Sequence, residues 1–240
     1  MTRVVYLGGK APGAAGLKVL LKMKNDLGID LIGVGASQRD GGVSEIASDA
    51  GIPLIATPDD IPACDILISL QYDKILKARH IERAGEIAVN LHFAPLPEYR
   101  GCNQFSLAIL DDRKEFGVTL HELDEGIDSG SILFERRFPI PEGIWVDQLH
   151  ALALEHANAL FEASLPALIK GEYEKRPQET LFAERGEPRM SYRKEIDTLK
   201  QIDLSQPGNV IDRSIRATAM PGFAPPYAIV AGERIDLVRS

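Results

Sequence analysis

The chain has 240 residues, 45% of them hydrophobic, which suits one sizeable domain with an appendage or two small domains. Its formal net charge of -8 argues against nucleic-acid binding, because phosphate neutralisation needs clustered lysines and arginines. The cysteines Cys64 and Cys102 form neither a disulfide framework nor a CxxC zinc pair. With no signal-like N-terminus and no apolar run near the ~20 residues that cross a bilayer, we expect a soluble, cytoplasmic protein.

The first part of the chain alternates apolar strands with helical patterns. We predict strands over 3–7, 31–34, 53–56, 65–70 and 87–91, and helices over 15–27 and 44–50, the second ending at a left-handed Gly51. Strands that are apolar on both faces and separated by helices are typical of a parallel sheet covered by helices. The predicted fold class is therefore α/β with a mostly parallel sheet.

The second part of the chain begins with a predicted strand pair over 116–123 and 131–140, antiparallel or mixed because the link is short. An amphipathic helix over 146–169 should pack across the sheet. Residues 172–190 are rich in Glu, Arg and Pro, and the C-terminal part predicts a helix over 209–217 and a hairpin with its turn at Ala231-Gly232-Glu233. We therefore divide the chain into a main domain (1–171), a linker (172–190) and a small α+β subdomain (191–240).

The first turn, residues 8–16, follows a strand and opens a helix. It is neither a GxGxxG fingerprint nor a Walker loop. Backbone N–H groups at a helix N-terminus, together with Lys10, could hold a phosphate at the carboxyl edge of such a sheet. A plain tight turn explains the same residues, and both interpretations stay open.

Asn90 and His92 lie at the end of a predicted strand. Residues two apart in a strand point to the same side, so both face one region while Leu91 enters the core. With Asp128 from the acidic loop 124–130, they form a set that can run acyl transfer without a metal or a covalent intermediate: the amide donates to an oxyanion, the imidazole moves a proton, and the carboxylate orients the imidazole. A zinc site of His92, His121 and Asp128 is the weaker alternative, because it lacks the usual ligand arrangement.

Four motifs occur here in order. They are Asn90-Leu91-His92, Leu-Pro-Glu-Tyr-Arg-Gly at 96–101, Gly117-Val118-Thr119, and Asp-Glu-Gly-Ile-Asp-Ser-Gly at 124–130. Over roughly residues 1–170 the chain resembles the formyltransferases of one-carbon metabolism, which use N10-formyltetrahydrofolate. The resemblance implies a Rossmann-like formyltransferase domain and attack of an amine on the formyl carbon through a tetrahedral intermediate. It assigns Asn90 to the oxyanion and Asp128 to the orientation and charge of His92. His92 either takes the amine proton or, as its cation, stabilises the oxyanion.

The resemblance also implies where the folate cosubstrate binds, and it implies no metal. Its pterin is held mostly by backbone, which points to residues 70–76 and 123–126. The cofactor-binding candidates are Tyr72, Lys74, Leu76, Leu123, Asp124 and Glu125. Asp124 and Glu125 could instead form a solvated acidic turn, and Tyr72 could be a wall of the pocket.

Family members differ in the amine that they formylate. Residues 181–240 hold nine Lys/Arg against eight Asp/Glu, and this near-neutral charge does not favour binding of tRNA. The segments 191–197 and 215–221 are similar to the sugar N-formyltransferases, so we expect a nucleotide-linked amino deoxysugar as substrate, with Lys10 and Arg100 meeting its phosphates. Methionyl-tRNA formylation and a non-catalytic folate-binding regulator remain the alternatives. The appendage, with Phe223 and Tyr227, either forms a homodimer contact or covers the core.

Overall fold

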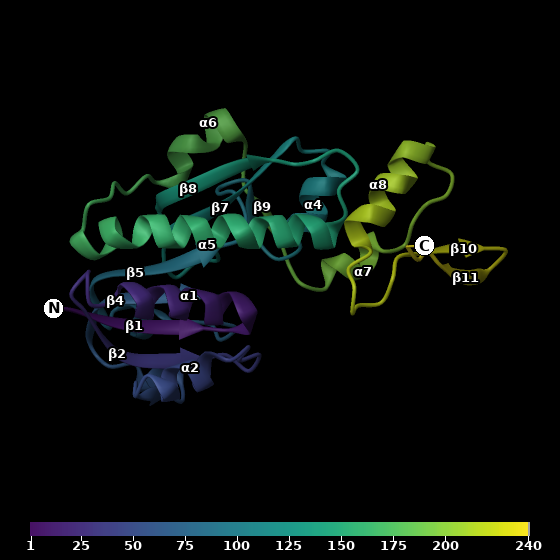
Figure 1. Ribbon diagram of the computed structural model, residues 1–240. Helices are drawn as coiled ribbons and strands as arrows, with labels where there is room; N and C mark the ends of the chain where they lie inside the picture. Colours follow the sequence, from purple (N-terminus) through teal and green to yellow (C-terminus); the bar gives the residue numbers. More distant parts are fainter. Residues whose placement is uncertain (240) are drawn as a thin grey trace.

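The computed structural model describes residues 1–239, and its centre is a twisted sheet flanked by helices (Figure 1). Within these residues the main sheet has seven strands. In spatial order they are β3 (Leu54–Ile55), β2 (Ile29–Ala36), β1 (Thr2–Gly8), β4 (Cys64–Leu70), β5 (Ala84–His92), β7 (Glu115–Glu122) and β8 (Ile132–Pro139). Strands β1 to β5 run parallel, whereas β7 runs antiparallel to β5, and β8 to β7. The predicted α/β class with a mostly parallel sheet is confirmed.

The two faces of the sheet bury alternate residues of each strand. On β5, Leu91 points into the larger core, which helices α1 (Lys10–Met23) and α5 (Val146–Lys170) cover. Ala88 points into a smaller core on the opposite face. Because residues two apart share a face, Asn90 and His92 lie on the side of Ala88.

The remaining helices of the main domain are short. They are α2 (Val43–Asp49), η1 (Pro58–Asp60), α3 (Ala78–Ile81) and α4 (Gln104–Leu110). Helix α1 begins at Lys10 and not near residue 15, because Pro12 lies in its first turn, where a missing N–H group costs nothing. Gly51 has a φ of 67°, as expected for the residue that follows a helix in the left-handed region.

The strand order reverses between β1 and β4, since β2 and β3 follow β1 on one side while β5 follows β4 on the other. In open α/β sheets ligands bind outside the carboxyl ends of the strands at such a reversal. The turn that starts at Gly9 after β1 and the turn that starts at Gln71 after β4 meet there. The fold thus indicates a ligand site at the same edge as Asn90 and His92.

The segment after α5 returns along the main domain. It contains η2 (Gln178–Leu181), α6 (Phe182–Arg185), β9 (Arg189–Ser191), α7 (Glu195–Leu199) and α8 (Gly208–Thr218). Strand β9 pairs in parallel with β6 (Tyr99–Gly101), and α8 packs against α4 and α5. The residues that the sequence predicts as a linker therefore carry secondary structure against the main domain, and the domain boundaries stay a prediction.

A hairpin ends the described chain, with β10 (Tyr227–Val230) antiparallel to β11 (Glu233–Asp236). Ala231 and Gly232 both have positive φ, 52° and 84°, as a two-residue hairpin turn requires. Phe223 is 64% exposed, so it does not cover the core, and the homodimer contact stays a prediction. Among the helices of residues 1–239, none has both the length and the apolar character to cross a membrane.

Candidate active site

The last residues of β5 and the neighbouring strand β7 form the floor of the candidate site. Their antiparallel register places Asn90 opposite His121 and His92 opposite Thr119. All four side chains therefore point from the same face of the sheet. The loop after β7 adds Asp128, whose carboxylate lies 3.5 Å from both His92 and His121. The structure thus brings together Asn90, His92 and Asp128, the residues that the sequence nominated as catalytic.

His92 is buried, and its hydrogen-bond partners define its tautomer. Nε2 lies 2.9 Å from the carbonyl oxygen of Tyr99, which can only accept, so Nε2 carries the hydrogen and donates it. In the neutral ring Nδ1 keeps its lone pair and faces Oδ2 of Asp128. Burial lowers the pKa of His92, although Asp128 opposes the change. A neutral His92 can accept a proton at Nδ1, and the resulting cation would lie directly beside a carboxylate.

Asp128 is held ionised between these groups. Its Oδ2 accepts a hydrogen bond from the backbone N–H of Gly101 at 2.9 Å. Burial alone would raise the pKa of Asp128, but His92, His121 and this N–H group together hold the pKa well below its usual range. A carboxylate that stays charged while its surroundings are mostly buried can stabilise a protonated imidazole.

His121 is the member of the site that the sequence prediction placed only in a weak zinc alternative. Its Nδ1 donates to the carbonyl oxygen of Glu122 at 2.8 Å, and its Nε2 lies 3.2 Å from Asn90 Nδ2 and 3.5 Å from Asp128 Oδ1. The Asn90 amide is thereby oriented, and the second hydrogen on Nδ2 remains for another acceptor. The sequence signal for His121 is its spacing. It follows Thr119 by two residues on a strand, so the two side chains share one face of the sheet.

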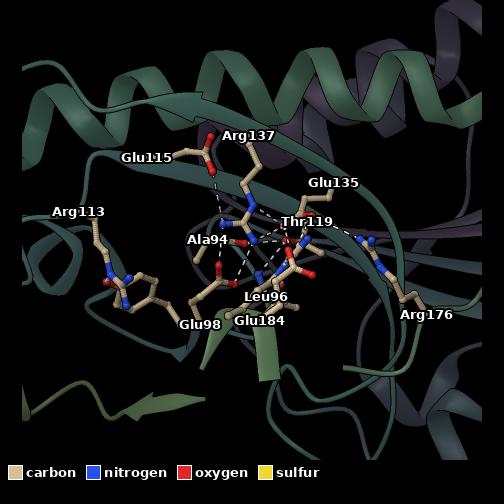
Figure 2. Close-up of polar contacts among 12 residues, drawn as sticks. Ala94, Leu96, Glu98, Arg113, Glu115, Thr119, Glu135, Arg137, Arg176 and Glu184 are labelled. Atoms are coloured by element: carbon tan, nitrogen blue, oxygen red, sulfur yellow. Dashed lines mark hydrogen bonds and ion pairs between the residues drawn. The ribbon is translucent and has the colours of Figure 1, made fainter. Parts of the chain in front are cut away.

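A network of buried polar groups fixes the loop that leaves His92 (Figure 2). Thr119 Oγ1 donates to the Ala94 carbonyl oxygen at 2.9 Å and accepts from the Leu96 N–H at 3.2 Å. Arg137 on β8 joins Glu98 of the loop to Glu135 of its own strand, at 2.7 and 2.6 Å. The loop carries the Tyr99 carbonyl that binds His92, so this network sets the tilt of the imidazole.

The two residues nominated for the substrate phosphates lie in different surroundings. Lys10 hydrogen-bonds to Gln71 at 2.7 Å, across the point where the strand order reverses. Its pKa is lowered, first by partial burial and then by the nearby cations of Arg39 and Arg193. Arg100 instead donates to Gln178 through Nε and Nη2, at 3.1 and 2.8 Å. Lys10 therefore lies among other cations, whereas the hydrogen bonds of Arg100 to Gln178 hold the loop that carries Arg100.

The side chains nominated for the folate gather only in part. Tyr72, Leu76 and Leu123 pack on the same smaller core, beneath the face that carries Asn90 and His92. The Tyr72 hydroxyl is buried without a hydrogen-bond partner among residues 1–239, and burial, then Asp73, raises its pKa.

The other three folate candidates lie outside this core, although the Lys74 ammonium is 5.9 Å from the centre of the Tyr72 ring. Lys74 donates to the Ala56 carbonyl oxygen at 3.0 Å. The Asp124 carboxylate accepts from Gly126 and Ser129 within its own exposed loop, and Glu125 is exposed. The contacts of Asp124 are those of the acidic-turn alternative, in which the side chain folds the loop.

Comparison with known proteins agrees with this geometry. A family described as "Formyl transferase" matches residues 60–163, which include Asn90, His92 and Asp128. A GDP-perosamine N-formyltransferase of Brucella melitensis is 30% identical over 181 residues, covering 73% of this chain and 67% of the relative. A methionyl-tRNA formyltransferase of Synechococcus is 32% identical, and the chain spans only 52% of that relative.

The fold is shared with solved structures as well. WlaRD, a sugar 3N-formyl transferase studied in the presence of dTDP and 5-N-formyl-THF, superposes with a TM-score of 0.81 at 24% identity, over 98% of this chain and 85% of the other. Since the Brucella relative is matched over two thirds of its length, the chain belongs to the formyltransferase family. The resemblance predicted from the four motifs is confirmed, and the protein is an enzyme of the transferase class.

Proposed function

We propose that the protein transfers a formyl group from N10-formyltetrahydrofolate to the amine of a nucleotide-linked amino deoxysugar. The observation that carries the proposal is the buried contact of His92 with Asp128, beside an oriented Asn90, at the carboxyl edge of the sheet. The similarity to a GDP-perosamine N-formyltransferase over 73% of the chain supports this class of acceptor. The near-neutral C-terminal part weighs against tRNA.

The chemistry starts when the amine attacks the formyl carbon. The carbonyl oxygen then becomes an oxyanion, and the second N–H of Asn90 donates to it, a kind of contact worth about 10²–10³ in rate. His92 takes the amine proton at Nδ1, the ring nitrogen that faces Asp128. The proton arrives beside a charged carboxylate, so the imidazolium is stabilised as it forms. When the intermediate collapses, the carbonyl re-forms and the bond from the formyl carbon to N10 of the folate breaks. The proton on His92 is then available to N10, so that tetrahydrofolate leaves as a neutral amine.

We propose that the phosphates of the acceptor bind at the carboxyl ends of β1 and β4. Lys10, Arg39 and Arg193 come from three separate segments. Burial, and then the two arginines, lower the pKa of Lys10, while Asp73 opposes the change. Such mutual repulsion is relieved when an anion binds between the cations. Arg100 is the weaker candidate, because Gln178 already binds two of its nitrogens.

We propose that the folate binds against the smaller core, on the face of the sheet that carries Asn90 and His92. The buried hydroxyl of Tyr72 is free to bind a polar atom of the pterin, and Leu76 and Leu123 offer apolar contact. Lys74, Asp124 and Glu125 would contribute through the backbone of their segments, since the Lys74 side chain binds the Ala56 carbonyl oxygen and the Asp124 side chain binds its own loop.

Incubation with N10-formyltetrahydrofolate and a panel of GDP- and dTDP-linked 3-amino and 4-amino sugars tests the proposal. We expect tetrahydrofolate release together with a mass gain of one formyl group on one of these sugars. His92→Asn serves as the inactive control. Absence of turnover with every sugar would refute the acceptor class, and turnover only with methionyl-tRNA would select the alternative.

A further inference from the structure

Gln178 is a nearly inaccessible polar residue, 1% exposed, at the start of η2 in the segment after the main domain. Its side-chain oxygen accepts both hydrogen bonds from Arg100. Its side-chain nitrogen donates to the carbonyl oxygens of Asp128 and Gly130, at 2.9 and 2.7 Å. The amide therefore uses both of its hydrogens and its oxygen.

The partners of Gln178 leave no ambiguity about its orientation. Carbonyl oxygens can only accept and a guanidinium can only donate, so the nitrogen must face Asp128 and Gly130 while the oxygen faces Arg100. Arg100 lies in the loop after His92, and Asp128 lies in the loop after His121. One side chain thus joins the two loops that carry the candidate catalytic groups.

The contact with Asp128 acts on a strained backbone. Asp128 has a φ of 51°, in the left-handed region, which Asp adopts more readily than most non-glycine residues but at a cost that its surroundings must offset. Gln178 holds the carbonyl of this same residue. On the other side of the contact, Arg100 precedes Gly101, whose N–H binds the Asp128 carboxylate. Gln178 therefore fixes both the backbone of Asp128 and the loop that binds its carboxylate.

Gln178 is itself anchored by contacts that do not involve Asp128. Arg176 and Arg185 form ion pairs with Glu135 at 3.4 and 2.9 Å, and Arg185 also donates to the Leu96 carbonyl oxygen at 3.0 Å. Figure 2 shows Arg176 reaching toward Glu135 of β8 from the side opposite Arg137. Beyond Gln178, β9 pairs with β6. A residue held on both sides along the chain can serve as a rigid support.

We propose that Gln178 is a positioning residue for formyl transfer: by bridging the two loops it sets the distance between the Asp128 carboxylate and the His92 imidazole. This inference rests on the proposed roles of His92 and Asp128. It also gives the segment 172–190 a part in the active site, although none of its residues need touch a substrate.

Gln178→Met keeps the length of the side chain and removes all four hydrogen bonds. We expect kcat to fall by about 10²-fold, because a misplacement near 1 Å of a catalytic group has that effect. KM for both substrates should change less than about threefold, since Gln178 contacts neither substrate in the proposed site. As control, Gln148→Met removes the hydrogen bond of a glutamine that caps α5, and it should leave kcat unchanged.

A second measurement needs no substrate. Histidine-selective NMR titration follows the five imidazoles, and His92→Asn assigns the His92 signal. If Gln178 positions Asp128, its loss moves the carboxylate away and the His92 pKa falls by about 1 pH unit. Because this readout is independent of the acceptor, it decides the inference even if no amino sugar is formylated.

Gln178→Glu separates the two contacts, because a carboxylate still accepts from Arg100 but cannot donate to Asp128. The inference expects kcat as low as in Gln178→Met. A folded Gln178→Met with kcat within threefold of wild type, or with an unshifted His92 titration, would overturn it. Wild-type kcat in Gln178→Glu would overturn it too, by assigning the role to Arg100 alone.

Discussion

Replacement of Asp128 by asparagine isolates the charge that lies beside His92. Asparagine has the same shape, tolerates the left-handed φ of 51° and keeps an oxygen for the N–H of Gly101. What it loses is the negative charge 3.5 Å from the imidazole. The variant therefore tests electrostatic stabilisation of the His92 cation without rebuilding the loop.

The expected loss follows from this separation. At an effective dielectric constant of ~20, unit charges 3.5 Å apart interact by about 5 kcal/mol. Opposite charges at such distances shift a pKa by about 1–3 units, which corresponds to about 1.4–4 kcal/mol. Since the cation forms only as the proton is transferred, we expect kcat to fall by about 10- to 10³-fold.

Steady-state release of tetrahydrofolate measures kcat, and equilibrium binding of the folate measures whether the pocket is intact. Folate affinity should stay within about threefold of wild type, because Asp128 is assigned to the reacting centre alone. Thermal unfolding confirms that the variant folds. If a folded Asp128→Asn enzyme retained kcat within threefold of wild type, charge stabilisation by Asp128 would be refuted.

Four further outcomes are expected. His92→Asn should lower kcat by about 10²–10⁴-fold with folate binding intact, and an undiminished rate would contradict its role as the base. Asn90→Ala should lower kcat by about 10²–10³-fold, so a loss below tenfold would argue against donation to the oxyanion. Gly101 has a φ of 82°, and a Cβ added there would strike the carbonyl oxygen of Ser191 in β9. Gly101→Ala should therefore lower the free energy of unfolding in urea by about 1–3 kcal/mol. The loss should exceed that of Gly143→Ala, where φ is 72° but the space around the added Cβ is open. Because the folded-state pKa of Asp128 is lowered, its ionised form stabilises the fold above the unfolded value of about 3.9. The advantage of wild type over Asp128→Asn in unfolding free energy should therefore shrink progressively as the pH falls from about 5 toward 2, with part of it remaining at the lower limit.

The sequence predicted the centre of the parallel sheet well because β1 and β4 are buried on both faces. A run such as β4 has one physical explanation, a strand covered by helices, and its bounds differ from the prediction by a single residue. The pattern failed at the start of α1, where Gly and Pro resemble a turn although Pro fits a first helical turn. Short pieces such as α3 and β6 carry too few residues for any period to be visible.

The site was predictable where residues two apart share a strand and unpredictable where distant segments meet. Parity predicts that Asn90 and His92 share a face, and the four motifs mark them as catalytic candidates. His121 needed the register between β5 and β7, which a sequence does not specify unless the link is a tight hairpin. Gln178 lies 50 residues from Asp128 in a stretch rich in Glu, Arg and Pro, and such composition predicts a solvated linker, not a buried amide.

The reversal of strand direction at β7 explains why the candidate catalytic groups can be both close and rigid. In a wholly parallel sheet the residues beside Asn90 and His92 would come from the carboxyl end of another strand. Here β7 runs the other way, so its own residues Thr119 and His121 pair directly with His92 and Asn90, while the loop after it turns back over the site. The side chains therefore rest on two hydrogen-bonded strands, and only Asp128 depends on a loop. That one loop residue is also the one whose backbone is strained and bridged by Gln178, as expected if its position limits the reaction.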